Sequence, residues 1–311
     1  MSRILITGCN GFVARYFVDY FRTKNIAAEF SGVDISPLCA LEGVAYSQMD
    51  LMDREGITKL LLANQPTHIA HFASVSSVSQ SWERPVESFT NNTNIFLNIV
   101  ESVRKLRLSP RILSIGSSEE YGNYPQQALP LKEHYQLHPS SPYAIARVAQ
   151  EMISKLYADS YDLEVMMTRS FNHIGPGQRD IFAIPSFIRQ MLDAKAANRT
   201  VISVGNSDIV RDFLDVRDVV DAYYKILFFG RKGEVYNVCS GIGYKLSDII
   251  KQVAEIIDFS PELIVDPVKV RPTDNQIVIG DSFKLMTELN WCPVIPLETS
   301  LRQTIALMAK E

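Results

Sequence analysis

RILITGCNGFVA, at residues 3–14, is the stretch that decides the fold of this chain. It reads as a short apolar strand, a turn with Gly8 and Gly11, and the start of a helix. Such a turn presents backbone N–H groups and a helix N-terminus to a pyrophosphate. The spacing is GxxGxxA, and alanine at Ala14 is small enough to keep helix and strand closely packed. The stretch predicts the first βα unit of a dinucleotide-binding fold; a plain tight turn is the alternative.

An acidic residue ends the next predicted strand. Asp34 follows the predicted strand at residues 29–33. A carboxylate at this place accepts hydrogen bonds from the adenosine ribose 2′-OH and repels a 2′-phosphate. This favours NAD(H) over NADP(H) as the cofactor. The alternative is a loop aspartate that caps the turn at residues 36–37. Asp50 and Leu51 follow a third strand and are placed to reach the adenine.

Strands and helical patterns alternate along the first half of the chain. Apolar runs at residues 68–74, 111–115 and 165–169 predict a parallel sheet covered on both faces. We therefore expect an α/β fold, a Rossmann-type doubly wound parallel sheet, with its ligands at the carboxyl ends of the strands. His71 lies inside one strand, has no partner histidine within reach by spacing, and is interpreted as a core residue.

The predicted cofactor-binding residues lie in the glycine turn, past the strand ends and in the Asn91-Asn92 segment before a helix. They are Gly8, Asn10, Gly11, Phe12, Val13, Asp34, Asp50, Leu51, Phe72, Ala73, Ser74, Asn92, Tyr143 and Arg147. The character of the chain changes near residue 175. We predict a dinucleotide-binding domain at 1–174 and a smaller α+β substrate domain at 175–311, with a strand near 212–240 returning to the first.

A second informative stretch is SSPYAIAR at residues 140–147. Ser141 and Pro142 suit the N-cap and the first position of a helix. Apolar residues then recur with helical spacing, and we expect this stripe to be buried: Ile145, Val148, Ala149, Met152, Ile153 and Leu156. Tyr143 and Arg147 share the opposite face. They are either an ordinary surface pair or an acid whose ionised form a cation stabilises.

Composition narrows the functional class. The chain has 311 residues, a net charge of −4 and 46% hydrophobic residues. This composition shows no basic patch of the kind that binds nucleic acid and no polybasic membrane anchor. We find no signal peptide and no apolar run long enough to span a bilayer. The four cysteines show no metal-binding spacing, and no metal site is predicted. We expect free thiols in a cytoplasmic protein.

Four stretches carry a resemblance to a known family. They are GSSEEYG at 116–122, SFNHIGPGQ at 170–178, VRDFLDVRD at 210–218 and VYNVCSG at 235–241. With the glycine turn, Asp34 and Tyr143, they resemble the extended short-chain dehydrogenase/reductases that act on nucleotide-linked sugars. The second and last stretches resemble the subgroup of GDP-4-keto-6-deoxy-mannose reductases. The resemblance covers essentially the whole chain.

The resemblance implies the catalytic roles. A keto group that accepts a hydride needs a proton donor, and the family supplies it from a tyrosine, here Tyr143. Ser117 stands where a serine or threonine donates a second hydrogen bond to the same oxygen. Arg147 replaces the family's lysine; it keeps the charge, but it is longer and planar, so the exchange is not conservative. Glu119 stands where the 4,6-dehydratases of the family carry a catalytic glutamate.

The resemblance also implies the partners of this chain. The substrate-binding positions are Ser118, Asn172, Gly177, Arg211 and Arg271, and two arginines suit a diphosphate because guanidinium groups pair with phosphate oxygens in a bidentate manner. Family members commonly form homodimers through a four-helix bundle. The helices that begin near Asn92 and at Pro142 are the candidates, because their apolar content exceeds what one sheet face needs.

Three functions remain open at this stage. The first is NAD(P)H-dependent reduction of the 4-keto group of a nucleotide-linked 4-keto-6-deoxy sugar, with GDP as the expected nucleotide. The second is an NAD-dependent 4-epimerase or 4,6-dehydratase, which shares the fold; Glu119 does not decide, because the reductase-like proteins also carry an acid there. The third is a cofactor-binding member that is catalytically weakened by Arg147.

Overall fold

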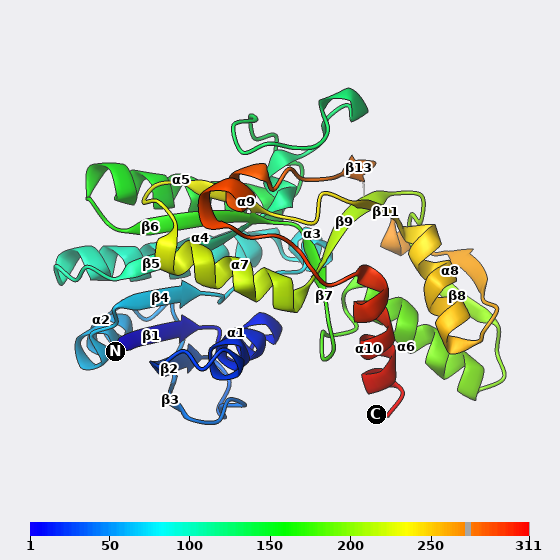
Figure 1. Ribbon diagram of the computed structural model, residues 1–311, viewed down its shortest axis with the longest axis horizontal. Coiled ribbons are helices and arrows are strands. Elements are labelled where there is room, and N and C mark those ends of the chain that lie inside the picture. The colour runs from blue at the N-terminus through cyan, green and yellow to red at the C-terminus, as the bar shows by residue number, and fades with distance from the viewer. Residues whose placement is uncertain (271–274, 311) are drawn as a thin grey trace.

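The computed structural model describes residues 1–270 and 275–310, and its centre is a seven-stranded parallel sheet (Figure 1). The sheet has the order β10-β6-β5-β4-β1-β2-β3, with every neighbouring pair parallel. Its strands are β1 (Ser2–Thr7), β2 (Ala28–Asp34), β3 (Val44–Gln48), β4 (His68–His71), β5 (Arg111–Ser117), β6 (Val165–Ser170) and β10 (Val235–Val238). The strand order reverses between β1 and β4, where such sheets bind dinucleotides. The predicted Rossmann-type fold is confirmed.

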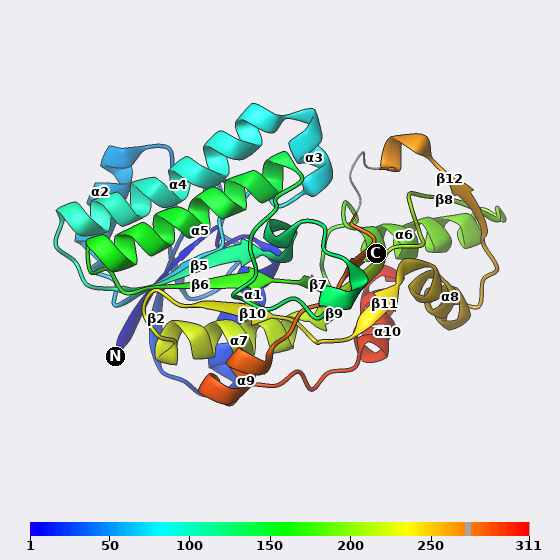
Figure 2. The same ribbon diagram turned by 90° about the horizontal axis from the view of Figure 1, so that it is seen from above.

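Helices cover both faces of this sheet (Figure 2). One face carries α2 (Arg54–Asn64), α4 (Pro85–Lys105) and α5 (Pro142–Ser160), with the short α3 (Val78–Glu83) before α4. The other face carries α1 (Phe12–Thr23), α7 (Val216–Phe229) and α9 (Phe283–Leu289). Ile4 and Ile6 pack toward α1 and α7, whereas Leu5 packs toward α2 and α4. A strand buried on both faces reads as a continuous apolar run, as residues 3–7 do.

A smaller unit lies beyond the carboxyl ends of the large sheet (Figures 1 and 2). Its strand β9 (Val210–Asp215) pairs with β7 (Asn172–Ile174), β11 (Gly243–Lys245) and β13 (Ile277–Val278), and β8 (Val201–Val204) pairs with β12 (Glu262–Val265). Around them lie α6 (Ala183–Ala196), α8 (Leu246–Ile257) and α10 (Leu297–Met308), which share a separate apolar core. Short 3₁₀ turns are η1 (Ser118–Tyr121), η2 (Gln126–Ala128) and η3 (Pro267–Lys269).

The chain crosses between the two units more than once. Strand β10 pairs with β6, so the segment after residue 233 does supply the last strand of the large sheet. Helices α7 and α9 also pack on that sheet. The boundary at residues 174/175 stays a prediction, because these three elements follow it in sequence but contact the first unit in space.

The expected burial of the apolar stripe on α5 is wrong for three of its six residues; Val148 is buried, and Ala149 and Ile153 are half-buried. Ile145, Met152 and Leu156 are 48%, 64% and 53% exposed in the single chain. The polar face of the helix, with Tyr143 and Arg147, is the one that packs on the sheet. Polar groups tolerate this burial because they are hydrogen-bonded to one another and to β5.

No helix within the described ranges is long and apolar enough to cross a membrane.

Candidate active site

The turn between β1 and α1 is shaped for close approach of a ligand to the backbone. Gly8 has φ +67°, and a Cβ there would lie 2.7 Å from the Ala73 backbone, so glycine is required. Gly11 precedes α1 without a side-chain cap, which leaves the N–H groups of the first turn, from Phe12 on, open to a ligand. An open helix N-terminus behind a glycine turn fits the pyrophosphate of a dinucleotide.

Asp34 lies beside this turn at the carboxyl end of β2. Its carboxylate accepts the backbone N–H of Asn10 at 3.1 Å and that of Ser36 at 3.1 Å. The Asn10 side chain bridges onward, donating to Leu38 O at 2.8 Å and accepting Ala40 N–H at 2.8 Å. Asp34 therefore caps the following turn, as one interpretation predicted. Its oxygens keep further lone pairs, and its role in binding a ribose hydroxyl stays a prediction.

Three of the predicted cofactor residues place their side chains in the core. Leu51 is buried beside α2 and α4, while Val13 and Phe72 pack against the core on the α1 and α7 side. Their side chains serve packing, so a cofactor contact from them comes from the backbone or from a partly exposed edge. Asp50 is exposed and accepts Met52 N–H at 2.9 Å, which leaves its carboxylate at the surface.

The loop after β4 is fixed from two sides. Thr7 Oγ1 accepts Ala73 N–H at 3.3 Å and pairs with His71 Nδ1 at 2.8 Å. Asn92 clamps Val75, accepting its N–H at 2.8 Å and donating to its carbonyl at 3.1 Å. Asn92 thus shapes the loop, with both polar atoms of its amide engaged. His71 is a core residue, as expected, although its Nε2 has no partner in the part of the chain that the structure describes.

Ser117 ends β5 and caps the η1 turn. Its Oγ accepts Glu119 N–H at 3.2 Å, so the hydroxyl proton remains free for donation to a ligand. Its own N–H donates to Glu120 Oε1 at 2.6 Å. Ser118 is buried beside it, and Glu119 is half-buried in the same turn.

Tyr143 and Arg147 lie on the first two turns of α5. Ser141 caps this helix, as predicted, with its Oγ accepting Ala144 N–H at 3.1 Å, and Pro142 is its first residue. Tyr143 is 7% exposed and Arg147 is 4% exposed, which excludes an ordinary surface pair. The guanidinium carbon of Arg147 lies 5.1 Å from the centre of the Tyr143 ring.

The Arg147 guanidinium ties α5 to two strand ends. Its Nη1 donates to Ile115 O at 3.0 Å, two residues before Ser117, and to Gln150 Oε1 at 2.7 Å. Its Nη2 donates to Ser74 Oγ in the loop after β4. The Nε–H is buried and has no partner among the described residues. This cation is therefore oriented mainly by protein groups and keeps donor capacity for a ligand.

The substrate-binding positions predicted in the second half gather around β9. Asn172 opens β7, pairs with Phe213 on β9 and donates to Asp212 O at 3.4 Å. Arg211, on the same strand, is buried and donates from Nη1 to Val210 O at 3.0 Å. Gly177 has φ +84° in the loop after β7. Arg271 lies outside the described residues.

A direct connection joins the glycine turn to this loop. The rings of Phe12 and His173 are stacked, with centroids 6.3 Å apart and an interplanar angle of 2°. Arg15 Nη2 and Tyr16 Oη both donate to Pro176 O, at 2.9 and 2.8 Å. The first two turns of α1 therefore contact both the predicted cofactor site and the predicted substrate loop.

Asp212 is a further buried group that the sequence analysis missed. Its carboxylate accepts the N–H groups of Ser240, Gly241 and Gly280 and the Ser240 hydroxyl, at 2.6 to 3.2 Å. Burial raises its pKa to about 6 despite these donors. It fixes the turn after β10 against β9. Its partners lie 28 to 68 residues away in sequence, so no local pattern signals this role.

Other missed residues form a polar layer under α5. Gln150 Nε2 donates to Ser114 Oγ at 2.9 Å, and Ser154 Oγ donates to the same atom at 2.9 Å. Arg147, Gln150 and Ser154 follow one another at spacings of three and four, a polar stripe that helical periodicity alone reveals.

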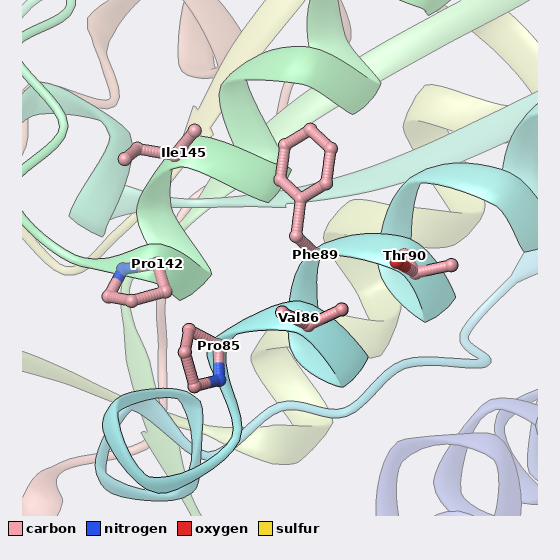
Figure 3. A pocket seen from close by; sticks show the side chains of 6 residues that line it. All are labelled: Pro85, Val86, Phe89, Thr90, Pro142 and Ile145. Atoms are coloured by element: carbon pink, nitrogen blue, oxygen red, sulfur yellow. The ribbon is translucent and has the colours of Figure 1, made fainter.

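Two negative findings limit the chemistry of the site. Within residues 1–270 and 275–310, no three His, Cys, Asp or Glu side chains are grouped to hold a metal ion. The apolar groove between α4 and α5 lies on the outer side of these helices and is lined by Pro85, Val86, Phe89, Thr90, Pro142 and Ile145 (Figure 3). It offers no titratable side chain for catalysis.

The chain is similar to several known proteins over nearly its whole length. A family model described as GDP-mannose 4,6 dehydratase matches residues 5–304. GDP-6-deoxy-D-mannose reductase of Pseudomonas aeruginosa is 32% identical over 308 residues, with 98% of this chain and 96% of that protein covered. The solved structure of RMD from Pseudomonas aeruginosa with NADPH aligns with a TM-score of 0.88 at 30% identity, covering 100% of this chain and 99% of the other. UDP-glucose 4-epimerase of Thermus thermophilus with NAD aligns at 0.87 and 26% identity, covering 98% of each chain.

Proposed function

The chain belongs to the GDP-mannose 4,6-dehydratase family, and from this premise we propose that it reduces the 4-keto group of a nucleotide-linked 4-keto-6-deoxy sugar with NAD(P)H. GDP is the proposed nucleotide, because the reductase relative from Pseudomonas aeruginosa carries GDP in its name. The observation that carries the proposal is the arrangement of Ser117 and Tyr143 with Arg147, past the strand ends and beside the glycine turn. These groups suit protonation of a carbonyl oxygen.

The chain's own residues handle the proton. A bound nicotinamide supplies the hydride. Ser117 donates a hydrogen bond to the carbonyl oxygen, since its Oγ already accepts Glu119 N–H and its proton is free. Tyr143 transfers its phenolic proton to the same oxygen as negative charge develops there. The Arg147 charge, 5.1 Å from the ring, stabilises the phenolate that remains.

The proposed cofactor is NAD(H), with NADP(H) as the alternative. A carboxylate at the end of the second strand, here Asp34, accepts a hydrogen bond from the ribose 2′-OH of NAD and repels a 2′-phosphate. Its position beside Asn10 supports the first choice. The relative solved with NADPH keeps the second choice open, and steady-state rates with the two nucleotides at matched concentrations decide between them.

The test of the function uses purified protein and the GDP-linked 4-keto-6-deoxy sugar. We expect loss of the reduced-nicotinamide absorbance and a 4-hydroxy product by NMR. Absence of any oxidation with NADH and with NADPH would contradict the proposal. UDP- and dTDP-linked keto sugars, supplied in parallel, test the choice of nucleotide.

A 4-epimerase or a 4,6-dehydratase is the second candidate, and Glu119 is the observation that favours the latter. Its half-buried carboxylate follows Ser117 and Ser118 in η1, where a base or acid for C5 and C6 chemistry would lie. Both activities regenerate their cofactor and retain it. Denaturing the purified protein and assaying released NAD separates them from the reductase, which exchanges cofactor in each turnover.

A weakened, cofactor-binding member is the third candidate, prompted by arginine at 147. The structure gives Arg147 partners at Ser74, Ile115 and Gln150 that a lysine reaches less completely, since an ammonium has fewer donors in a different geometry. We expect Arg147→Lys to lower kcat. Activity that appears only in Arg147→Lys would show that the native chain is not an enzyme of this type.

A homodimer through α4 and α5 completes the proposal. The support is the apolar surface that these adjacent helices leave exposed. Val86 and Phe89 on α4 lie beside Ile145 on α5 (Figure 3). The exposed fractions are 76% for Val86, 42% for Phe89 and 64% for Met152. A four-helix bundle with a second copy would cover it.

We also propose the cytosol as the compartment, because all four cysteines are free thiols.

A further inference from the structure

Glu120 is a completely buried carboxyl group next to the proposed catalytic turn. Its Oε1 accepts the Ser117 N–H at 2.6 Å. Its Oε2 is buried and has no hydrogen-bond partner in the described ranges, and the Arg169 Nε lies 4.0 Å away. The short bond and the unpartnered oxygen together call for an explanation.

The nearby cation is already engaged by another carboxylate. Arg169 donates to Glu151 from Nε at 2.9 Å and from Nη2 at 2.7 Å, and from Nη1 to the Glu133 carbonyl at 2.9 Å. The charged groups that act on Glu120 are Glu151 on α5 and Arg169 on β6, and the titratable Tyr121 follows it in η1. One guanidinium thus serves two carboxyl groups, so a charged Glu120 would be buried without full compensation.

A proton on Glu120 resolves this conflict. Burial and the neighbouring Glu151 raise the pKa of Glu120 well above its usual range. A proton on Oε2 removes the uncompensated charge and turns the unpartnered acceptor into a donor that faces the Glu151 carboxylate. Oε1 keeps its bond from Ser117.

The glycine at position 116 leaves space for the Glu120 carboxyl group. A Cβ at Gly116 would overlap Glu120 Oε1 and the Thr168 carbonyl. Glycine before Ser117 therefore lets the carboxyl fold back under the end of β5. The segment 116–120 is built so that Glu120 reaches the backbone of the residue that donates to the substrate.

We propose that Glu120 is a positioning residue whose neutral, protonated carboxyl anchors the backbone of Ser117 and so fixes the direction of the Ser117 hydroxyl. The proposal rests on the proposed reduction, in which Ser117 donates to the substrate carbonyl. It acts through Ser117, because Glu120 has no exposed surface with which to touch a ligand.

Two variants at this position carry the kinetic test. Glu120→Gln keeps an acceptor for the Ser117 N–H and a donor toward Glu151, so we expect kcat within about threefold of the wild type. Glu120→Leu keeps the bulk and removes the anchor, and we expect kcat to fall by about 10- to 100-fold with both KM values little changed. Asp218→Leu is the matched control: its buried carboxylate accepts the backbone N–H groups of Val294 and Ile295 at 3.0 and 2.9 Å, away from Ser117, and its loss should leave kcat unchanged.

A second measurement keeps the proposal testable if Glu120→Leu fails to fold or the chain has no reductase activity. At neutral pH the wild type should show the infrared carbonyl band of a protonated carboxylic acid, which Glu120→Gln should lack. The Ser117 amide should exchange hydrogen slowly in both proteins. Wild-type kcat in a folded Glu120→Leu, equal damage in Glu120→Gln, or absence of that band would overturn the proposal. An inactive wild type that keeps the band would contradict only the reductase assignment.

Discussion

Two properties of Tyr143 suit its proposed role as the proton donor. Its ring is buried against the sheet, and it lies beside a guanidinium that is held in place by Ile115 and Ser74. The fixed cation offsets the negative charge that the phenolic oxygen gains as its proton is transferred. The residue type and the environment thus support a general acid.

Tyr143→Phe removes the proton donor and keeps the ring. We expect kcat to fall by about 10²- to 10⁴-fold with little change in nucleotide-sugar affinity. Tyr157→Phe is the control on the same helix, since its hydroxyl donates to Glu101 Oε2 at 2.9 Å, far along α5 from the site. Steady-state kinetics of the two variants measure the effect. Equal losses in both would show that the damage comes from α5 and not from the proton donor.

His71 makes the stability of the protein depend on pH. Burial, and then the charge of Arg147, lower the pKa of His71 to about 3. The folded state keeps the ring neutral while the unfolded state takes up a proton near its ordinary pKa of about 6.5. The stabilisation is therefore complete above that value and is lost as the pH falls from there toward 3.

Urea unfolding measures this effect. Between about pH 7.5 and about pH 5.5 the wild type should lose about 1.4 kcal/mol more of its free energy of unfolding than His71→Gln does. His134→Gln removes an exposed histidine and should keep the wild-type slope. A His71→Gln slope equal to that of the wild type would contradict the buried neutral ring.

Helix α1 connects the predicted pyrophosphate site to the predicted substrate loop. Its first turns contact β7 through the Phe12–His173 stack and the loop after β7 through the bonds of Arg15 and Tyr16 to Pro176. An element that contacts both ligand sites can couple their occupancy. Any such coupling is reciprocal by thermodynamic necessity.

Tyr16→Phe weakens this connection and leaves the ring in place. We expect NADH affinity to be unchanged when no nucleotide is present, while the gain in GDP affinity that bound cofactor brings falls by about two- to tenfold. Tyr20→Phe, one turn later, is the control, because its hydroxyl binds Asp221 at 2.6 Å instead of the loop. Calorimetric titration of GDP with and without NADH provides the measurement. Equal gains in Tyr16→Phe and the wild type would exclude coupling through this bond.

The whole molecule is a large sheet unit and a smaller unit that meet at the strand ends, and α4 and α5 leave an apolar surface exposed. That surface follows α4 and α5 and includes Phe89, Ile145 and Met152. Helix α9 carries the exposed Phe283 on the opposite face of the large sheet (Figure 2). The two surfaces provide a matched comparison for the oligomeric state.

A charge within the α4–α5 surface should prevent association. We expect the wild type to sediment as a dimer, and Ile145→Glu with Met152→Glu to give a folded monomer, because a bundle interface does not accommodate buried unpaired carboxylates. Phe283→Glu, at 68% exposure on the other face, should remain dimeric. Analytical ultracentrifugation distinguishes these outcomes, and a monomeric wild type would contradict the interface.

Local patterns were enough for much of the architecture. The glycine turn, the apolar strands and the Ser141-Pro142 helix start all lie where they were predicted, because turn chemistry, strand runs and caps depend on neighbours in sequence. Residues 8, 34, 117 and 143 were also placed at strand ends or helix starts for the same reason. Their individual roles in binding and catalysis stay predictions.

Local sequence patterns did not predict contacts between residues that are distant in sequence. The buried anchor at Glu120 needs Gly116 and Arg169, and the carboxylate of Asp212 needs Ser240 and Gly280. Each depends on elements that meet only after folding. Hydrophobic periodicity does not show which distant residues come into contact.

The sequence by itself determined a doubly wound parallel sheet with a glycine turn and a serine–tyrosine pair at its carboxyl ends. These features depend on residues that are close together in sequence. Only the tertiary structure decided which face of α5 is buried. Hydrophobicity alone sends Ile145 and Met152 inside, yet the sheet offers Ser114 and Ile115 O as partners for Gln150 and Arg147. Hydrogen bonds from another strand thus made the polar face the inner one and left the apolar face outside.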